Sequence, residues 1–468
     1  MRRFFRKPFS TALLCAIVHS SSAATPPQRV DVIVRGRYVV TMDAAHRLIE
    51  DGAVAVLGSR IVAVDTASSI SQRFTALHTV DKPNAAILPG LIDTHTHAPM
   101  SLFRAIADDR RLQDWLHNFI FPAESHNVNA DFVRWGTRLA CLEMLLAGIT
   151  TYTDMYYFED VEAETAKEAG VRGVLGQSVI GFPAPDYKTW QEALAATERY
   201  IQKFKGDDLI TPAVAPHSIY TTPNEALAGS RKLADKYDVP LLIHLAETKT
   251  EVDESVAKRG LTPTQVLDQL GVLRGRTVAA HSVWVSSDDL QILERTGTGV
   301  AHCPSSNTKL ASGIAPVTAM LKLGIHVGLG NDGFAGSNDS ANLIREMDLA
   351  AKLQKVKQMD PTVVSAEQAL EMATIGGARV LGLEKEIGSL EAGKRADLVT
   401  LSLAQPHTTP LYNLYSLLVY TAQASDVQDV FINGRQIVRD QQVLTLDRVD
   451  ILRKSLEYKR QILSSLEH

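Results

Sequence analysis

Disulfide bridges cannot hold this fold together, because the sequence contains very few cysteines. The 468 residues include only three cysteines, at positions 15, 141 and 303, which is too few for a disulfide framework. With 45% hydrophobic and 22% charged residues, the chain has instead the balance of a globular protein with a large apolar core. It is long enough for one large domain with an elaboration, or for two domains.

Long apolar runs are absent as well. The N-terminal stretch has four basic residues within positions 2–7, a short apolar segment at 11–18 and small residues at 22–24. The apolar segment falls short of the ~20 residues that a membrane span needs, whereas the whole pattern is typical of an export signal. We expect residues 1–24 to be a signal peptide and the protein to be periplasmic or secreted. A membrane anchor or an amphipathic extension is the alternative.

An excess of positive charge is the third missing feature. The formal net charge is −5, and removal of residues 1–24 would take away four positive charges and no negative ones, leaving −9. A mildly acidic protein has no electrostatic attraction to nucleic acid or to anionic membranes. We therefore expect a small-molecule substrate, no nucleic-acid partner, and no membrane association after processing.

The chain does contain a series of short apolar runs separated by longer amphipathic stretches. Continuous apolar runs of this kind are typical of parallel strands that are buried on both faces. A doubly wound sheet would usually carry a glycine-rich phosphate loop after its first strand, and the sequence has none. The pattern therefore predicts an α/β fold, a (β/α)₈ TIM barrel over residues 88–388. The eight expected strands lie within 85–97, 148–156, 171–180, 209–218, 239–247, 276–284, 297–307 and 324–333.

The segments that flank the expected barrel have a different pattern. Short, alternating, turn-punctuated stretches occur at 29–43 and 52–65, and again at 395–403 and 426–440. Such stretches are typical of antiparallel sheet. They predict one small β-sandwich built from residues 25–87 and 389–468, with a terminal surface helix in the last twenty or so residues.

Ionisable residues recur at the carboxyl ends of the expected barrel strands, where the active sites of such barrels lie. A lone histidine in an apolar strand is usually a hydrogen-bonded core residue. The recurrence at one position of several strands indicates instead a shared site. The residues are His95 and His97 after the first strand, His217 after the fourth, His244 and Glu247 after the fifth, His281 after the sixth and Asp332 after the eighth.

These residue types are suited to a metal-assisted hydrolase. Zinc takes three or four nitrogen or oxygen ligands and keeps one position open for water when the site is catalytic. The candidate ligands are His95, His97, His244 and Asp332, which leaves Glu247 and His281 free for proton transfer. A second metal would want a bridging lysine or carboxylate after the fourth strand, where the sequence reads "AVAPHSIY". We therefore expect one divalent ion.

Several of these stretches resemble motifs of a known family. "PGLIDTHTHAPM", "HLAET", "AAHSVW" and "GLGNDG" resemble the motifs of the amidohydrolase superfamily. Within it, "THTHAPMSLFRAIADD", "TDMYYF", "APHSIY" and "SSNTKLASGIAPV" resemble the 5-methylthioadenosine/S-adenosylhomocysteine deaminases. Guanine, 8-oxoguanine and triazine hydrolases look similar and remain the alternative. The resemblance covers nearly all of the chain after the expected signal peptide.

The resemblance implies a role for each matching residue. His95, His97, His244 and Asp332 would hold zinc or ferrous iron. Glu247 would protonate the ring nitrogen, while His281 and Asp332 orient and deprotonate the attacking water, and ammonia would leave. Glu124 would bind the ribose hydroxyls, His217 would contact the substrate and Trp115 would line the pocket. A homodimer or higher homo-oligomer is also implied.

Two positions depart from the family pattern. Gln177 stands where several members have an arginine that meets the homocysteine carboxylate. A neutral amide forfeits the bidentate ion pair of an arginine, so Gln177 at the substrate makes S-adenosylhomocysteine a doubtful substrate, while adenosine and methylthioadenosine stay open. Asn331, just before the metal aspartate, stands where threonine is common.

Overall fold

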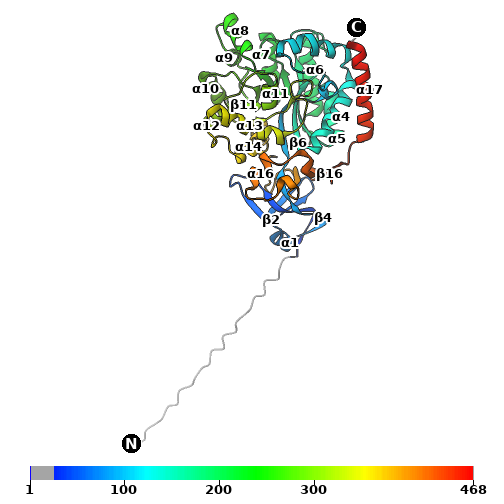
Figure 1. The fold of residues 1–468 in the computed structure, drawn as a ribbon, viewed down its shortest axis with the longest axis vertical. Coiled ribbons are helices and arrows are strands. Elements are labelled where there is room, and N and C mark those ends of the chain that lie inside the picture. Colours follow the sequence, from blue (N-terminus) through cyan, green and yellow to red (C-terminus); the bar gives the residue numbers. More distant parts are fainter. Residues whose placement is uncertain (2–25, 467–468) are drawn as a thin grey trace.

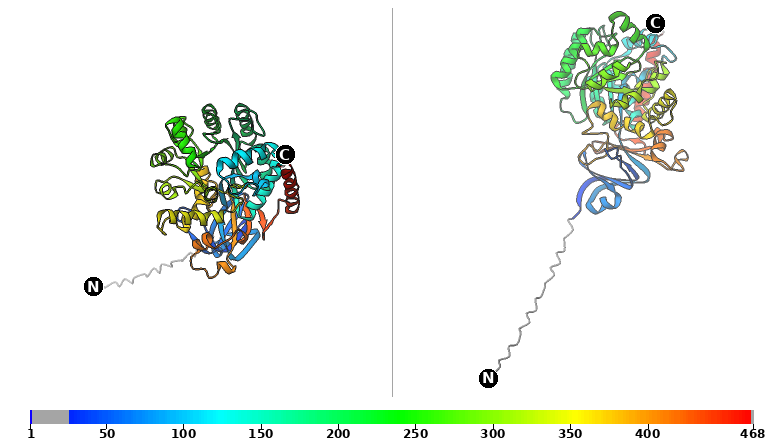
Figure 2. Two further views of the ribbon diagram at one scale, coloured as in Figure 1. Left: turned by 45° about the horizontal axis from the view of Figure 1, so that its top comes forward. Right: turned by 90° about the vertical axis from the view of Figure 1, so that its left-hand side faces the viewer.

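The computed structural model describes Met1 and residues 26–466 (Figure 1). Apart from Met1, the expected signal peptide lies outside the described residues. Within those residues, no helix has both the length and the apolar character that a membrane crossing requires. The chain forms a barrel with a β-sheet domain beside it, and both ends of the chain contribute to the sheet (Figures 1 and 2).

The barrel confirms the predicted (β/α)₈ fold. Its eight parallel strands each lie within one of the expected apolar runs, and the pairing of Leu329 with Asp93 joins the last strand to the first. A two-residue strand, β13 (Asp332–Gly333), adds a further pairing to the first strand. In order around the barrel, the strands are β5 (Leu91–His97), β6 (Ile149–Tyr156), β7 (Arg172–Val179), β8 (Ile210–Pro216), β9 (Leu241–Leu245), β10 (Thr277–His281), β11 (Gly299–His302) and β12 (Val327–Leu329).

Helices cover the outside of the barrel, which is why its strands are apolar on both faces. Local signals fix several helix ends: Thr189 and Glu192 form a capping box at the start of α6, and Gly170 ends α5 at φ 79°. The helices are α4 (Ala130–Leu146), α5 (Glu159–Ala169), α6 (Trp190–Phe204), α7 (Asn224–Tyr237), α8 (Lys249–Arg259), α9 (Pro263–Gln269), α10 (Ser287–Thr296), α11 (Pro304–Lys309), α12 (Val317–Lys322), α13 (Leu343–Gln358), α14 (Ala366–Met372) and α15 (Ile375–Leu381).

A long connection after β5 covers the carboxyl end of the barrel. It consists of short helical pieces instead of one regular helix, and it carries several buried aromatic and aliphatic side chains. This connection is important for the site, because it holds Trp115 and Glu124. Its pieces are η1 (Ala98–Phe103), α2 (Leu112–Trp115), the π-helical η2 (Leu116–Ile120) and α3 (Phe121–Asn127).

The separate β domain built from both chain ends is also confirmed. Its strands join into one continuous sheet, because the 16-residue β4 pairs with β1 in parallel and with β14 in antiparallel fashion. Val34, Ile61 and Phe431 share one core there, so segments from before and after the barrel pack together. In sheet order, the strands are β17 (Gln442–Val443), β16 (Arg435–Arg439), β15 (Val427–Ile432), β14 (Leu398–Ser402), β4 (Phe74–Pro89), β1 (Gln28–Val40), β2 (Leu48–Leu57) and β3 (Arg60–Thr66).

A buried ion pair connects the barrel to the sheet. Arg172, at the start of β7, donates two hydrogen bonds to the carboxylate of Asp397, at 2.9 and 3.3 Å, and a third to Asn433 at 2.7 Å. The side chains of Arg172 and Asp397 are only 8% and 2% exposed. The sheet also carries α1 (Ala67–Arg73) and α16 (Leu414–Tyr420), with the short turns η3 (Pro406–Thr408) and η4 (Ala424–Asp426).

The terminal helix α17 (Arg448–Leu466) lies against the barrel beside α4 (Figure 1). Its buried face includes Ile451 and Ile462, and the Tyr458 hydroxyl donates to the Asp131 carboxylate at 2.7 Å. Although α17 follows the sheet domain in the chain, it supports the connection that carries Glu124.

Candidate active site

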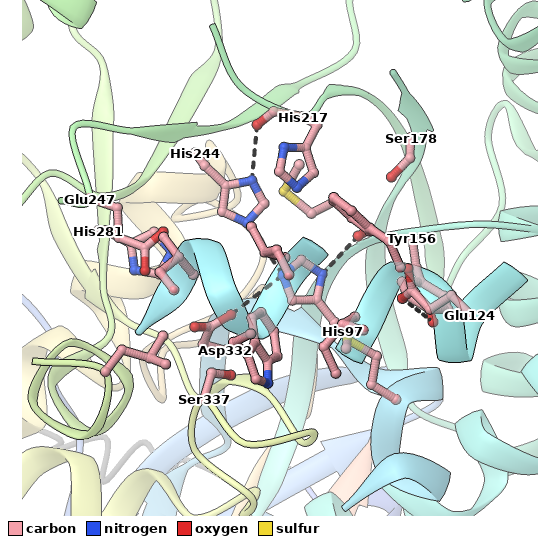
Figure 3. Close-up of a pocket in the computed structure, with 18 of the residues that line it drawn as sticks. His97, Glu124, Tyr156, Ser178, His217, His244, Glu247, His281, Asp332 and Ser337 are labelled. Atoms are coloured by element: carbon pink, nitrogen blue, oxygen red, sulfur yellow. Dashed lines mark hydrogen bonds and ion pairs between the residues drawn. The ribbon is translucent and has the colours of Figure 1, made fainter. Parts of the chain in front are cut away.

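The four predicted metal ligands meet at the carboxyl end of the barrel, and Figure 3 shows three of them, His97, His244 and Asp332. His95 and His97 lie two residues apart on β5, so strand alternation puts them on the same face, with ring centres 4.9 Å apart. The His244 ring is also 4.9 Å from His95. The Oδ1 atom of Asp332 lies 3.3 Å from His95 Nε2 and 3.4 Å from His97 Nε2.

Backbone carbonyls fix the orientation of two of these imidazoles. The Nδ1 atom of His97 lies 2.9 Å from the Met155 carbonyl, and that of His244 lies 2.9 Å from the His217 carbonyl. A carbonyl oxygen only accepts, so both Nδ1 atoms carry the proton. The two Nε2 lone pairs therefore face each other at 3.3 Å. His95 Nε2 is buried without a hydrogen-bond partner.

This set of donors fits a divalent metal ion. Facing lone pairs and an unpartnered buried nitrogen are unfavourable alone, but three imidazole nitrogens and a carboxylate oxygen are the ligands that zinc takes. Burial lowers the pKa of His95 to about 4 and that of His244 well below its usual value, so both are neutral. Burial alone would raise the pKa of Asp332, but the adjacent histidines hold it well below the usual range.

The two predicted proton-transfer residues lie beside the ligands. His281 Nε2 is 3.8 Å from Glu247 Oε2, and both side chains line the same cavity as His97, His244 and Asp332. Burial raises the pKa of Glu247, which favours its protonated form. Burial lowers the pKa of His281, but the Glu247 and Asp332 carboxylates outweigh this effect and hold that pKa above its usual value.

A cavity with a volume of about 60 Å³ lies above the ligands. One wall is apolar and comes from the connection after β5. Among the described residues, no lysine or arginine lines the cavity. Besides the metal and proton-transfer residues, the lining consists of Met100, Leu112, Trp115, Leu116, Ile120, Phe121, Glu124, Met155, Tyr156, Tyr157, Ser178, His217, Tyr220, Leu310 and Ser337.

Three of the four predicted substrate-binding residues face this cavity. Glu124 is only 4% exposed and accepts a hydrogen bond from the Tyr156 hydroxyl at 2.6 Å (Figure 3). Burial raises the pKa of Glu124 to about 7. His217 and Trp115 also line the cavity, and the Trp115 indole donates to the Ala335 carbonyl at 2.7 Å.

Gln177 is the exception. Its side-chain amide donates to the Asp186 carboxylate at 2.8 Å, and its side-chain carbonyl accepts from the Glu159 backbone at 3.4 Å. The structure therefore does not place Gln177 at the cavity, whereas the next residue, Ser178, does line it. The Gln177 side chain is turned instead toward the start of α5, and its predicted contact with the substrate stays a prediction.

Sequence reasoning missed the hydroxyl groups of the cavity. Tyr156, Tyr157 and Ser178 lie at the carboxyl ends of β6 and β7, at the same level as the metal ligands of other strands. Their position at the ends of expected strands was the signal that could have indicated them. The structure also shows what the Asn331 side chain contacts. Its amide donates to the Asp93 carboxylate at 2.5 Å, next to the metal ligands.

Residues 86–437 match the sequence profile of the amidohydrolase family. The chain belongs to the amidohydrolase family. Among curated amidohydrolase relatives, it is 45% identical to 5-methylthioadenosine/S-adenosylhomocysteine deaminase 1 of Syntrophus aciditrophicus, over 94% of this chain and 99% of that protein. It is 44% identical to the 5-methylthioadenosine/S-adenosylhomocysteine deaminase of Thermodesulfovibrio yellowstonii, over 92% of this chain and 99% of that protein.

Solved amidohydrolase structures have the same fold. An adenosine deaminase from Xanthomonas campestris with bound zinc superimposes with a TM-score of 0.92 at 37% identity, covering 94% of this chain and all of that one. An atrazine chlorohydrolase from Arthrobacter aurescens in complex with zinc gives a TM-score of 0.84 at 26% identity, covering 92% of this chain and all of that one.

Proposed function

We propose that this amidohydrolase is a zinc-dependent hydrolytic deaminase that removes the amino group of an adenine nucleoside and releases ammonia. One observation carries the proposal: three imidazoles and one carboxylate that could hold a metal lie next to Glu247 and His281 at one cavity. The deaminases among its relatives and the zinc in the adenosine deaminase structure support the same chemistry.

Different side chains carry out the different proton transfers of such a reaction. A divalent metal held by the four ligands would supply Lewis-acid activation of a water molecule. His281 Nε2 points to the same space and accepts a proton from that water, with Asp332 beside it. Glu247, whose pKa burial raises, donates a proton to the ring nitrogen. The water oxygen adds to the ring carbon. His281 then passes its proton to the amino group, which leaves as ammonia while the proton of the added hydroxyl returns to Glu247 and the ring carbonyl forms.

The cavity favours a substrate without a charged tail. Glu124 and Tyr156 offer acceptor and donor groups suited to ribose hydroxyls, and the wall from Leu112 to Phe121 is apolar. No lysine or arginine among the described lining residues would pair with a carboxylate. We therefore place 5-methylthioadenosine and adenosine ahead of S-adenosylhomocysteine as substrates.

Ammonia release from a panel of nucleosides tests this function. We expect turnover of 5-methylthioadenosine or adenosine that a chelator abolishes and zinc restores. Glu247→Gln should lower kcat by at least about 100-fold, since general acid catalysis contributes about 10²–10⁴-fold. Glu254→Gln is the matched control, because Glu254 lies on α8 in an exposed ion pair. Normal turnover by Glu247→Gln would refute the assignment of the proton donor.

The same panel separates the alternative activities. Guanine, 8-oxoguanine and a chlorotriazine are included, with chloride measured alongside ammonia. Because these compounds lack ribose, Glu124→Gln should leave their turnover unchanged, whereas it should raise the KM for a nucleoside. A free base or triazine as best substrate, insensitive to Glu124→Gln, would favour the alternative.

We also propose that the enzyme is exported and acts on external compounds. The basic start, short apolar segment and small residues at 22–24 support this proposal. Expression of the full chain in a bacterial host, followed by fractionation and N-terminal sequencing, tests it. A periplasmic or secreted protein that begins near position 24 or 25 is expected, and a cytoplasmic protein that begins at Met1 would refute it.

A further inference from the structure

The three groups that handle protons and metal come from different strands, yet all contact one short segment. Residues 306–312 lie after β11 and include most of α11. The Ser306 hydroxyl donates to Asp332 Oδ2 at 2.5 Å. His281 Nδ1 lies 3.0 Å from Asn307 Oδ1, and the Ser312 hydroxyl lies 3.5 Å from Glu247 Oε1.

The 306–312 segment is itself fixed by buried hydrogen bonds. The Ser312 backbone donates to the Asn307 carbonyl at 2.8 Å, and the Trp284 indole donates to the Ser312 carbonyl at 2.6 Å. Just before the segment, the Ser305 backbone donates to Glu346 on α13 at 3.0 Å. Ser306 and Asn307 are 0% and 1% exposed. The segment can therefore hold its neighbours in fixed positions.

Each contact has a distinct chemical consequence. Ser306 occupies one oxygen of Asp332, which directs the other toward His95 and His97. The Asn307 oxygen can only accept, so His281 Nδ1 carries its proton and Nε2 is left as the acceptor.

The third contact acts on the proton donor. Ser312 approaches Oε1 of Glu247, while Oε2 faces His281. The conformation of the held residues also calls for support. His281 and Asp332 adopt positive φ values of 70° and 67°, which residues other than glycine keep only when their surroundings impose them.

We propose that Ser306, Asn307 and Ser312 are positioning residues for the deamination reaction, acting through Asp332, His281 and Glu247 respectively. This inference rests on the proposed function and extends it to a stretch that the sequence analysis left without a role, "SSNTKLAS". One segment thus sets the orientation of the ligand carboxylate, the tautomer of the base and the rotamer of the acid.

The test compares three variants with a control from the same turn. Ser306→Ala, Asn307→Ala and Ser312→Ala each remove one contact, whereas Ser305→Ala removes a buried hydroxyl that contacts none of the three held residues. We expect kcat to fall about 10–100-fold for Ser306→Ala and Asn307→Ala, and less for Ser312→Ala, whose contact is longer. KM should change less than threefold, and Ser305→Ala should keep wild-type kcat.

Conservative variants and a spectroscopic readout separate positioning from folding. Ser306→Thr and Asn307→Asp keep the donor or acceptor and should recover most of kcat. In ¹⁵N-histidine NMR spectra of the zinc-loaded protein, His281 should be the Nδ1–H tautomer in the wild type and lose that preference in Asn307→Ala. These spectra do not depend on turnover.

The outcomes for the two proposals differ. A wild-type protein without deaminase activity would overturn the proposed function, while the NMR comparison would still report on Asn307. An active wild type in which Ser306→Ala and Asn307→Ala match Ser305→Ala in kcat would overturn the positioning roles. So would an unchanged His281 tautomer in Asn307→Ala.

Discussion

The hydrogen bond from Tyr156 to Glu124 should set the pH range in which the enzyme binds its substrate. Burial raises the pKa of Glu124 to about 7 even though the Tyr156 and Tyr157 hydroxyls lower it. Only the ionised form of Glu124 can accept hydrogen bonds from two ribose hydroxyls, because the protonated form has a proton on one of its oxygens. We therefore expect the wild-type KM to be high below pH 7 and to fall as the pH rises through about 7.

The substitution Tyr156→Phe removes the 2.6 Å donor and leaves the ring in place. A hydrogen bond to a charged group contributes about 1.5–3 kcal/mol, and one pKa unit corresponds to about 1.4 kcal/mol. The pH at which KM falls should therefore be about one to two units higher in this variant, at about pH 8–9. Loss of the hydroxyl destabilises the carboxylate, which fixes the upward sign of the shift.

Steady-state kinetics from pH 6 to 9.5 measure this effect. Tyr220→Phe is the matched control, because Tyr220 lines the same cavity, whereas the hydroxyls that lower the pKa of Glu124 are those of Tyr156 and Tyr157. Its KM profile should coincide with that of the wild type. A Tyr156→Phe profile with the midpoint unchanged, or a loss confined to kcat, would refute the assignment of Glu124 to substrate binding.

Three further predictions concern stability, substrate choice and the metal. Asp397→Asn leaves Arg172 charged and buried, so the free energy of unfolding measured in urea should fall by about 3–5 kcal/mol. The control Asp238→Asn changes an exposed ion pair and should lower it by less than about 1 kcal/mol. Equal losses in the two variants would contradict the role of burial. Gln177→Arg should not improve kcat/KM for S-adenosylhomocysteine, because residue 177 faces away from the cavity. Ser178→Arg should improve it, because residue 178 lines the cavity. The reverse result would show that an arginine introduced at position 177 reaches the substrate. Removal of zinc with a chelator should lower Tm, measured by calorimetry, with recovery on adding zinc back; an unchanged Tm would contradict binding at the four ligands.

The barrel and its metal ligands were predictable because burial shapes the sequence directly. Strands covered on both faces are largely apolar, so β8 and β9 are visible in the sequence as short apolar runs. Ionisable residues that end such runs, such as His244 and Asp332, are conspicuous because the residues just before them are apolar or small. Their convergence follows from the parallel arrangement of the strands.

Side-chain direction at strand ends was not predictable in the same way. A shift of one residue moves a side chain to the other face of a strand, and it decides whether Gln177 or Ser178 faces the cavity. The joining of both sheet halves through β4 depends on pairings between residues more than 300 positions apart, such as Pro89 with Leu398. No local pattern encodes such a pairing.

The closure of the barrel gives the metal site a second consequence. The last strands meet the first through few pairings, of Leu329 with Asp93, Asp332 with Thr96 and Gly333 with His97. Because His97 and Asp332 stand on opposite sides of that seam, an ion bound by both would fasten it. Local opening of the metal-free protein should therefore begin there, and amide hydrogen exchange at Gly333 should slow markedly when zinc binds.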